Sequence, residues 1–386
     1  MRCPVVASRQ PDRHTRGMLD QVRAELKRQF LERDEVVDGL LIALLCRQHV
    51  LLLGPPGTAK SQLVRALADR LEGARTFEWL LTKFTTPEEL FGPVDLPALE
   101  AGRYDRLIDR KLPTAEVAFL DEVFKANSAI LNALLTLMNE RTFHQGSGPV
   151  SVPLETLVAA SNELPDEEAL EALYDRFLLR FRVEYLNGDA RFLELLRLPE
   201  PTAPEAVIDR EQLSVWRREV DAVEVPEPVL RDVLEIRNRL AAEGVQPSDR
   251  RFKSALRVLR GAARLEGRST VEPADLAWLR HVLWSDPEDV PKVEKALEHV
   301  ASGFEDEARR LMGQAREVYG YATRAWGDTG SQARAALEAH TKLVDLSKRL
   351  QQLAAQAESR GRDASSLSAL ADEVDRMQAN LLGAKN

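Results

Sequence analysis

Short apolar runs alternate with stretches of helical spacing over the first two hundred residues. The runs are Val50–Leu53, Phe77–Leu81, Val117–Leu120, Leu157–Ala160 and Phe181–Tyr185. Their length and continuity predict buried strands. Apolar residues recur with helical spacing over about 15–47, after the turn at 54–57, and over 130–138. Buried strands that alternate with helices predict an α/β fold, with a mostly parallel sheet covered on both faces.

A hairpin and a helical second half complete the predicted organisation. Thr142–Phe143 and Val150–Val152 flank a Gly-rich turn and predict the hairpin. After the Pro-rich segment at 199–204 the spacing is helical, with helices expected around 229–240, 256–265 and 276–283. From Val293 apolar residues follow a three-and-four spacing in three stretches, which predicts an antiparallel helical hairpin or small bundle. The expected boundaries are 1–198 for an αβα core, 199–204 for a linker, 205–290 for an all-helical lid and 291–386 for C-terminal helices.

Composition narrows the functional classes. The 386 residues carry 53 Lys and Arg against 62 Asp and Glu, a formal net charge of −9. This acidity argues against non-specific nucleic-acid binding. Two cysteines, Cys3 and Cys46, cannot build a disulfide framework or a tetrahedral metal site, and Cys46 is expected in the core. The N-terminus lacks a secretory pattern, and no apolar stretch is long enough to span a bilayer, so a cytoplasmic location is expected.

The first candidate site is a Gly-rich turn between a predicted strand and a predicted helix. Its residues are Gly54, Pro55, Pro56, Gly57, Thr58, Ala59, Lys60 and Ser61. Backbone N–H groups in such a loop approach phosphates, and the helix N-terminus adds a positive field. Lys60 would reach the β- and γ-phosphates of ATP, and Ser61 would ligate Mg²⁺. Ala59 departs from the strict pattern, which has Gly before the Lys, and is tolerable if its φ is negative.

Paired carboxylates end the run Val117–Leu120. Asp121 would hold Mg²⁺ through water, and Glu122 would act as the general base toward the attacking water. This strand is expected to lie directly beside Val50–Leu53, so that both residues face the phosphates. Such a pair alone is often only an exposed strand end, and its position downstream of the Gly-rich loop gives it weight.

Further polar residues follow the later runs. Asn162 ends an apolar strand and can orient the water or contact the γ-phosphate. Arg176 could be offered to a neighbouring subunit as an arginine finger, although a surface ion pair is the favoured explanation when it is taken alone. Arg250 and Arg251 open a helix after Gln246-Pro247-Ser248, and either could contact the γ-phosphate.

Four motifs resemble, in their order along the chain, those of the MoxR branch of AAA+ ATPases. They are GPPGTAKS, VAFLDE, AASNELP and LYDRFLLR. The closer resemblance is to RavA-like regulatory ATPases. It rests on FEWLLTKFTTPEELFGPVDLPAL, GRYDRLIDRKLPTAEVAFLDEVFKANSAILNALLTLMNERTF and VQPSDRRFKSALRVLRGAARLEGRSTVEPADL, and covers roughly residues 18–290.

The resemblance implies an αβα core, an all-helical lid and a hexameric ring with ATP bound between subunits. It implies that Asn162 is the sensor-1 residue, Arg176 the arginine finger and Arg250 the sensor-2 arginine, with Arg251 as a competitor. It places the insert around 88–92 and the hairpin at 142–154 on the pore side. It also implies a partner with a von Willebrand factor A domain and chaperone-like action on protein complexes. The β-rich domain of RavA-like chains is not expected, because 291–386 shows only helical periodicity.

Three functional hypotheses remain at this point. The first is a ring-shaped motor that remodels a protein client. The second is a related AAA+ machine acting on nucleic acid or on a metal-insertion complex, against which the acidity and the resemblance argue. The third is a switch in which ATP controls assembly. The adenine contacts are expected near Phe30–Val36, without a particular residue being assigned.

Overall fold

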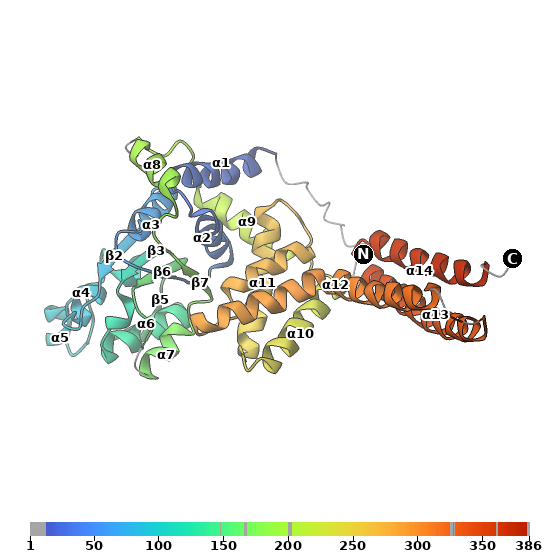
Figure 1. Ribbon diagram of the computed structural model, residues 1–386. Helices are drawn as coiled ribbons and strands as arrows, with labels where there is room; N and C mark the ends of the chain where they lie inside the picture. The colour runs from blue at the N-terminus through green and yellow to red at the C-terminus, as the bar shows by residue number, and fades with distance from the viewer. Residues whose placement is uncertain are drawn as a thin grey trace, which may run out of the picture. The chain divides into compact units, whose positions relative to one another are not determined.

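The structure is a computed structural model that describes residues 13–146, 148–165, 168–199, 203–324, 327, 329–359 and 362–383 (Figure 1). Cys3, the centre of the Pro-rich segment and Ser147 in the hairpin turn lie outside the described residues. Within the described ranges, none of the helices combines the length and apolar composition that a bilayer crossing needs.

A five-stranded parallel sheet forms the centre of the first part of the chain. Its strands are β1 (Val50–Leu53), β2 (Thr76–Leu80), β3 (Val117–Asp121), β6 (Thr156–Ser161) and β7 (Leu179–Arg182), in the order β2-β3-β6-β1-β7. All four strand pairs are parallel, as the uninterrupted apolar runs predict. The predicted α/β fold with a parallel sheet is therefore confirmed.

Two expectations about the strands were wrong. β6 lies between β1 and β3, so the strand that ends in Asp121 is not the direct neighbour of β1. Because all strands run the same way, their carboxyl ends still share one edge of the sheet. β2 is not a buried strand, since only Phe77 along it is buried. It lies at the edge of the sheet, with β3 as its single strand partner.

Helices cover the sheet and extend beyond it. They are α1 (Arg13–Gln29), α2 (Asp34–Cys46), α3 (Lys60–Ala68), α4 (Pro87–Phe91), α5 (Leu96–Glu100), α6 (Ser128–Glu140), α7 (Glu168–Tyr174), α8 (Asp189–Arg197), α9 (Arg210–Ala222) and α11 (Asp249–Leu265). Short 3₁₀ turns lie at Leu112–Thr114 and Val123–Lys125. The strands β4 (Thr142–Gln145) and β5 (Gly148–Ser151) pair antiparallel, which confirms the hairpin.

The centre of this core is the contact of α2 with the sheet. From Val36 onward every residue of α2 is buried, including Cys46, as expected for a largely apolar helix. The one carboxylate among them, Asp38, pairs with Arg23 and Lys27. Gly39 lets the helix approach β7 closely, because a Cβ there would lie 2.1 Å from the Phe181 ring. The same burial raises the pKa of the Cys46 thiol to about 12, so this cysteine is an inert core residue.

The chain divides into two compact units that do not follow sequence order. The first contains residues 1–224, 247–271 and 278–285, and the second 225–246, 272–277 and 286–386. The expected lid at 205–290 is thus shared between them, with α11 in the first unit and α10 (Glu227–Ala242) in the second. The helix expected at 276–283 is instead a 3₁₀ run, Pro273–His281, and a further 3₁₀ turn covers Pro287–Asp289. Apolar residues spaced by three suit a 3₁₀ helix as well as an α-helix.

The second unit contains the three predicted C-terminal helices, α12 (Val290–Thr323), α13 (Thr329–Ser359) and α14 (Ser365–Gly383). They bury a shared apolar core that includes Leu311, Leu343 and Val374, which confirms a small bundle. Arg362, which follows α13, donates to the buried carboxylate of Asp232 on α10 at 3.3 Å. This ion pair fixes the bundle to α10 within the unit.

Candidate functional site

The Gly-rich loop joins β1 to α3 at the carboxyl edge of the sheet. Lys60, the first residue of α3, folds back so that its Nζ donates to the carbonyls of Gly54 and Pro55, each at 2.7 Å. The Thr58 hydroxyl donates to the same Pro55 carbonyl at 2.9 Å. The first N–H groups of α3 have no carbonyl partner within the helix. The loop therefore combines free amide donors with an ammonium group, as an anion site requires.

The ammonium group of Lys60 is partly shielded from solvent. Burial lowers the pKa of its ammonium, and the carboxylates of Asp121 and Glu122 oppose that shift. The two carboxylates thus lie close enough to the loop for their charge to be felt at Lys60. Because β6 separates β1 from β3, this proximity arises at the shared carboxyl edge of the sheet rather than from strand pairing.

Ala59 adopts a backbone conformation that the sequence did not anticipate. Its φ is 64° and its ψ 19°, which is the left-handed region, so the condition of a negative φ is not met. The loop turns sharply into α3 and also holds Gly57 at a φ of 79°. A residue with a Cβ in this region costs about 1–2 kcal/mol relative to the right-handed form. The turn geometry, and not the residue type, sets this conformation.

Glu122 is held from two sides at the end of β3. The Asn162 side-chain amide donates to Glu122 Oε1 at 2.6 Å, and Lys125 Nζ lies 3.3 Å from Glu122 Oε2. Glu122 itself has a φ of 54°, and its N–H donates to Asp121 Oδ1 at 3.0 Å. The structure therefore brings together Asp121, Glu122 and Asn162. Sequence reasoning missed Lys125, whose only signal was its place three residues after Glu122.

The donor set here suits a hard divalent cation. Ser61 offers a hydroxyl and Asp121 a carboxylate, and oxygen donors of this kind, few in number and completed by water and phosphate, are typical of Mg²⁺ sites. Among the described residues no group of three or more His, Cys, Asp and Glu side chains could hold a metal by itself. A cation bound here would thus depend on the phosphates of a nucleotide for further ligands.

The arginines occupy the opposite edge of the same sheet. Arg176 and Arg250 line a pocket of about 210 Å³ together with His49 and Leu178. His49 directly precedes β1, and Leu178 directly precedes β7, so this pocket lies at the amino ends of the strands. From His49 to Gly54 the chain makes five steps in extended conformation, which span about 16 Å. Neither arginine therefore lies near the Gly-rich loop of its own chain.

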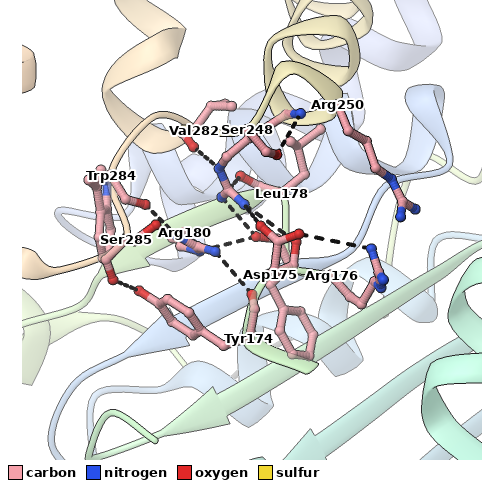
Figure 2. A network of polar contacts seen from close by, with 12 residues as sticks. Tyr174, Asp175, Arg176, Leu178, Arg180, Ser248, Arg250, Val282, Trp284 and Ser285 are labelled. Atoms are coloured by element: carbon pink, nitrogen blue, oxygen red, sulfur yellow. Dashed lines mark hydrogen bonds and ion pairs between the residues drawn. The ribbon is translucent and has the colours of Figure 1, made fainter. Parts of the chain in front are cut away.

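Arg176 and Arg250 lie close together at this pocket. Figure 2 shows their guanidinium groups on one side of the surrounding polar network. Burial lowers the pKa of Arg176, and the charge of Arg250 lowers it further. The ion pair of Arg176 with Asp175 is long, with 3.9 Å between the guanidinium nitrogen and the carboxylate oxygen. Arg250 donates to the Asn139 side chain at 3.3 Å. Two like charges that face one pocket favour the binding of an anion.

Arg251 has a different environment from its neighbour in sequence. Its side chain is 3% exposed, and it donates to the carbonyls of Phe177, Leu178 and Val282 and to the Asp175 carboxylate. Arg180 is likewise buried, and it donates to the carbonyls of Tyr174, Phe177 and Trp284 (Figure 2). These two arginines cross-link α11 and the segment 278–285 to the loop between α7 and β7. Sequence reasoning did not separate Arg251 from Arg250, because both lie in the first turn of the same helix.

Three features together define a P-loop protein of the AAA+ class. They are the order of the strands in the sheet, the loop between β1 and α3, and the residues at the ends of β3 and β6. Comparison with known proteins agrees. The family model described as the MoxR domain in MoxR-vWA-beta-propeller ternary systems matches residues 17–215, and an AAA lid domain matches 228–297. The chain therefore belongs to the MoxR family of AAA+ ATPases.

Individual relatives extend this likeness. The uncharacterized protein MJ0812 of Methanocaldococcus jannaschii is 43% identical over 300 residues, which is 76% of this chain and 80% of that protein. Chaperone MoxR1 of Mycobacterium tuberculosis is 31% identical over 49% of this chain and 50% of its own. A crystal structure of a "putative ATPase" from Cytophaga hutchinsonii matches with a TM-score of 0.61 and 20% identity, covering 75% of this chain and 94% of that one, which shows the shared fold.

Proposed function

We propose that the protein hydrolyses ATP in a homo-hexameric ring in which each active site is completed by a neighbouring subunit. The observation that carries this proposal is the separation of Arg176 and Arg250 from the Gly-rich loop of the same chain, at opposite edges of one sheet. A head-to-tail contact brings the two edges of successive subunits together, and such a contact closes into a ring when its rotation allows.

Each residue then has a role that follows from its position. The loop amides and Lys60 bind the β- and γ-phosphates, and Glu122 accepts a proton from the attacking water. Asn162, which already donates to Glu122, orients that carboxylate and the water. Ser61 and Asp121 would hold Mg²⁺, which supplies charge neutralisation at the phosphates.

Arg176 serves as the finger toward the neighbour's γ-phosphate, and Arg250 serves as the second cation. Arg250 is preferred to Arg251 because Arg251 is buried and already donates to five oxygen acceptors, whereas Arg250 is exposed and donates to the Asn139 side chain. Arg251 is then a structural residue that positions the Asp175–Leu178 loop and, with it, Arg176.

The wider activity is proposed from the family. The ring would remodel protein complexes in a chaperone-like way, together with a partner that carries a von Willebrand factor A domain. The description of the matching family model names such a partner, and one relative is named a chaperone. The insert that contains α4 and the hairpin β4–β5 would face the pore and contact the client.

A mixing experiment tests the shared active site. Arg176→Ala keeps the nucleotide loop and loses the finger, whereas Lys60→Ala loses the loop and keeps the finger. We expect each variant alone to be inactive, because removal of an arginine finger costs about 10³-fold or more. Mixed rings should regain ATPase activity, since a Lys60→Ala subunit can offer its Arg176 to the intact loop of its neighbour.

The controls address folding and assembly. Arg231→Ala removes an exposed arginine on α10 and should leave the rate unchanged. Glu122→Gln should bind ATP and fail to turn over, and the wild-type rate per subunit should rise with protein concentration. A concentration-independent rate that survives Arg176→Ala would refute the proposal and leave a P-loop protein whose sites act alone.

A further inference from the structure

The helix α8 presents its apolar residues to solvent. Its sequence is Asp189–Arg197, and within the described part of the chain none of these 9 residues is buried. Phe192 and Leu196 are 54% and 65% exposed, and Leu193 and Leu195 are also exposed. At about 100° per residue these four side chains occupy one arc of roughly 160°. Figure 1 shows α8 standing clear of the five-stranded sheet.

The polar residues of α8 are exposed as well, and one of them approaches Glu32 of its own unit. Arg191 pairs with Glu194 at 2.7 Å and approaches Glu32 at 4.0 Å. A surface helix of a globular protein ordinarily turns its apolar stripe inward and its charges outward. In α8 the apolar stripe is exposed as well, which leaves a contiguous apolar surface, typical of a site that another protein covers.

The base of α8 is fixed beside the nucleotide loop. After β7 the chain passes Tyr185, whose hydroxyl donates to the Pro56 carbonyl at 3.2 Å. The Asn187 N–H then donates to Glu32 at 3.0 Å, and Gly188, with a φ of 84°, turns the chain into the helix. The apolar surface of α8 is therefore continuous with the edge of the sheet at which ATP would bind.

We infer that α8 is a docking helix for a second copy of this chain, covered by the subunit that offers Arg176. This inference rests on the proposed shared active site. A neighbour that reaches the nucleotide loop must lie against the sheet edge from which α8 projects. Beside α8 the exposed acidic residues, Glu32, Asp34, Glu184, Asp189 and Glu194, outnumber the exposed arginines, Arg182, Arg191 and Arg197. This excess of negative charge suits a neighbour whose facing edge carries Arg176 and Arg250.

The first test measures assembly. Phe192→Glu combined with Leu196→Glu places charges on the apolar arc, and Leu337→Glu combined with Val344→Glu makes the matched change at exposed apolar positions of α13. All chains carry Glu122→Gln so that ATP stays bound, and sedimentation measures the concentration of half-assembly. We expect the α8 variant to shift this concentration upward by at least tenfold and the α13 variant to leave it unchanged.

A fluorescent ATP analogue serves as the check on folding. An isolated subunit of the α8 variant should bind the analogue with the same Kd as an isolated subunit that has the wild-type α8, because the substituted residues make no contact with the Gly-rich loop. Unchanged assembly of the α8 variant, or an equal shift in the α13 variant, would overturn the inference.

The second test identifies the occupant. A photo-crosslinking residue at position 196 is placed in a full-length chain, and light and heavy isotope-labelled chains are mixed in the presence of ATP. Mixed light–heavy crosslinks to peptides near Arg176 or Arg250 would support the inference. Crosslinks only within one chain, or crosslinks to an added von Willebrand factor A domain protein alone, would overturn it.

The two proposals fail in distinguishable ways. If Arg176→Ala retains full ATPase activity, the shared active site itself is wrong. If Arg176→Ala is inactive, mixing with Lys60→Ala restores the rate, and the α8 variant assembles like wild type, the shared site holds and only the role of α8 is refuted.

Discussion

Protonation of His49 should set the acid limit of the stability of the core. This side chain is buried between β1, β6 and α6. Its Nδ1 accepts from the Leu157 N–H at 3.0 Å, so its Nε2 carries the proton and donates to the Met138 carbonyl at 3.3 Å. Burial lowers its pKa from 6.5 to about 3, and the charge of Arg141 adds to this shift.

The sign of the effect follows from linkage. Because the pKa of His49 is lower in the folded state, this side chain binds a proton below pH 6.5 in the unfolded chain and stays neutral in the folded chain. The contribution of His49 to the free energy of unfolding is thus constant above about pH 6.5, and it becomes unfavourable to the folded state as the pH falls toward 3. At about 1.4 kcal/mol per pH unit, roughly 2 kcal/mol of unfolding free energy should be lost between pH 6.5 and pH 5.

Two measurements check this expectation. NMR of histidine-labelled protein should show that the His49 ring, assigned by its loss in His49→Asn, does not titrate between pH 8 and pH 5. Urea unfolding followed at the core should fall more steeply with acid in wild type than in His49→Asn, which is less stable at pH 8 because the Met138 bond is lost. A His49 midpoint between pH 6 and 7, or parallel pH profiles, would refute the reasoning.

Other substitutions probe the backbone and the arginines. Ala59→Gly should raise the unfolding free energy by about 1 kcal/mol, seen as a higher Tm, because Gly adopts the left-handed region without penalty; a lower Tm would contradict this. Gly39→Ala should cost about 1–3 kcal/mol in urea unfolding, since its Cβ would overlap the Phe181 ring. Arg251→Ala should cost about 3 kcal/mol or more by the same assay, because it leaves buried acceptors unpaired. Arg250→Ala should leave stability within about 0.5 kcal/mol and lower the ATPase rate, and equal stability losses in the two variants would argue against their separate roles.

Local signals in the sequence were sufficient for much of the fold. The continuous apolar runs predicted a parallel sheet because strands covered on both faces have no polar side to alternate. The three-and-four spacing after Val293 predicted the C-terminal bundle for a similar reason, since each helix must bury one stripe. The loop Gly54–Ser61 and the pair Asp121 and Glu122 could be predicted as a candidate site because their chemistry depends on contiguous residues.

Features that depend on distant parts of the chain were not predictable in this way. The insertion of β6 between β1 and β3 is a matter of strand order, which no local pattern encodes. The left-handed φ of Ala59 follows from the turn that joins β1 to α3, against the preference of the residue itself. The exposed apolar arc of α8 has the same sequence pattern as a buried amphipathic helix, and only its position shows that the arc is uncovered.

The sequence by itself determined the class of chemistry, because phosphate binding and water activation require particular residue types at short, fixed spacings. Only the tertiary structure separated Arg250 from Arg251 and placed Arg176 at the sheet edge opposite the nucleotide loop. Adjacent arginines are equivalent in a sequence, and they differ in the folded chain because one finds buried carbonyl acceptors while the other is left facing an open pocket. The direction in which a side chain points is decided by long-range packing, and this is why the proposal of a shared active site depends on the structure.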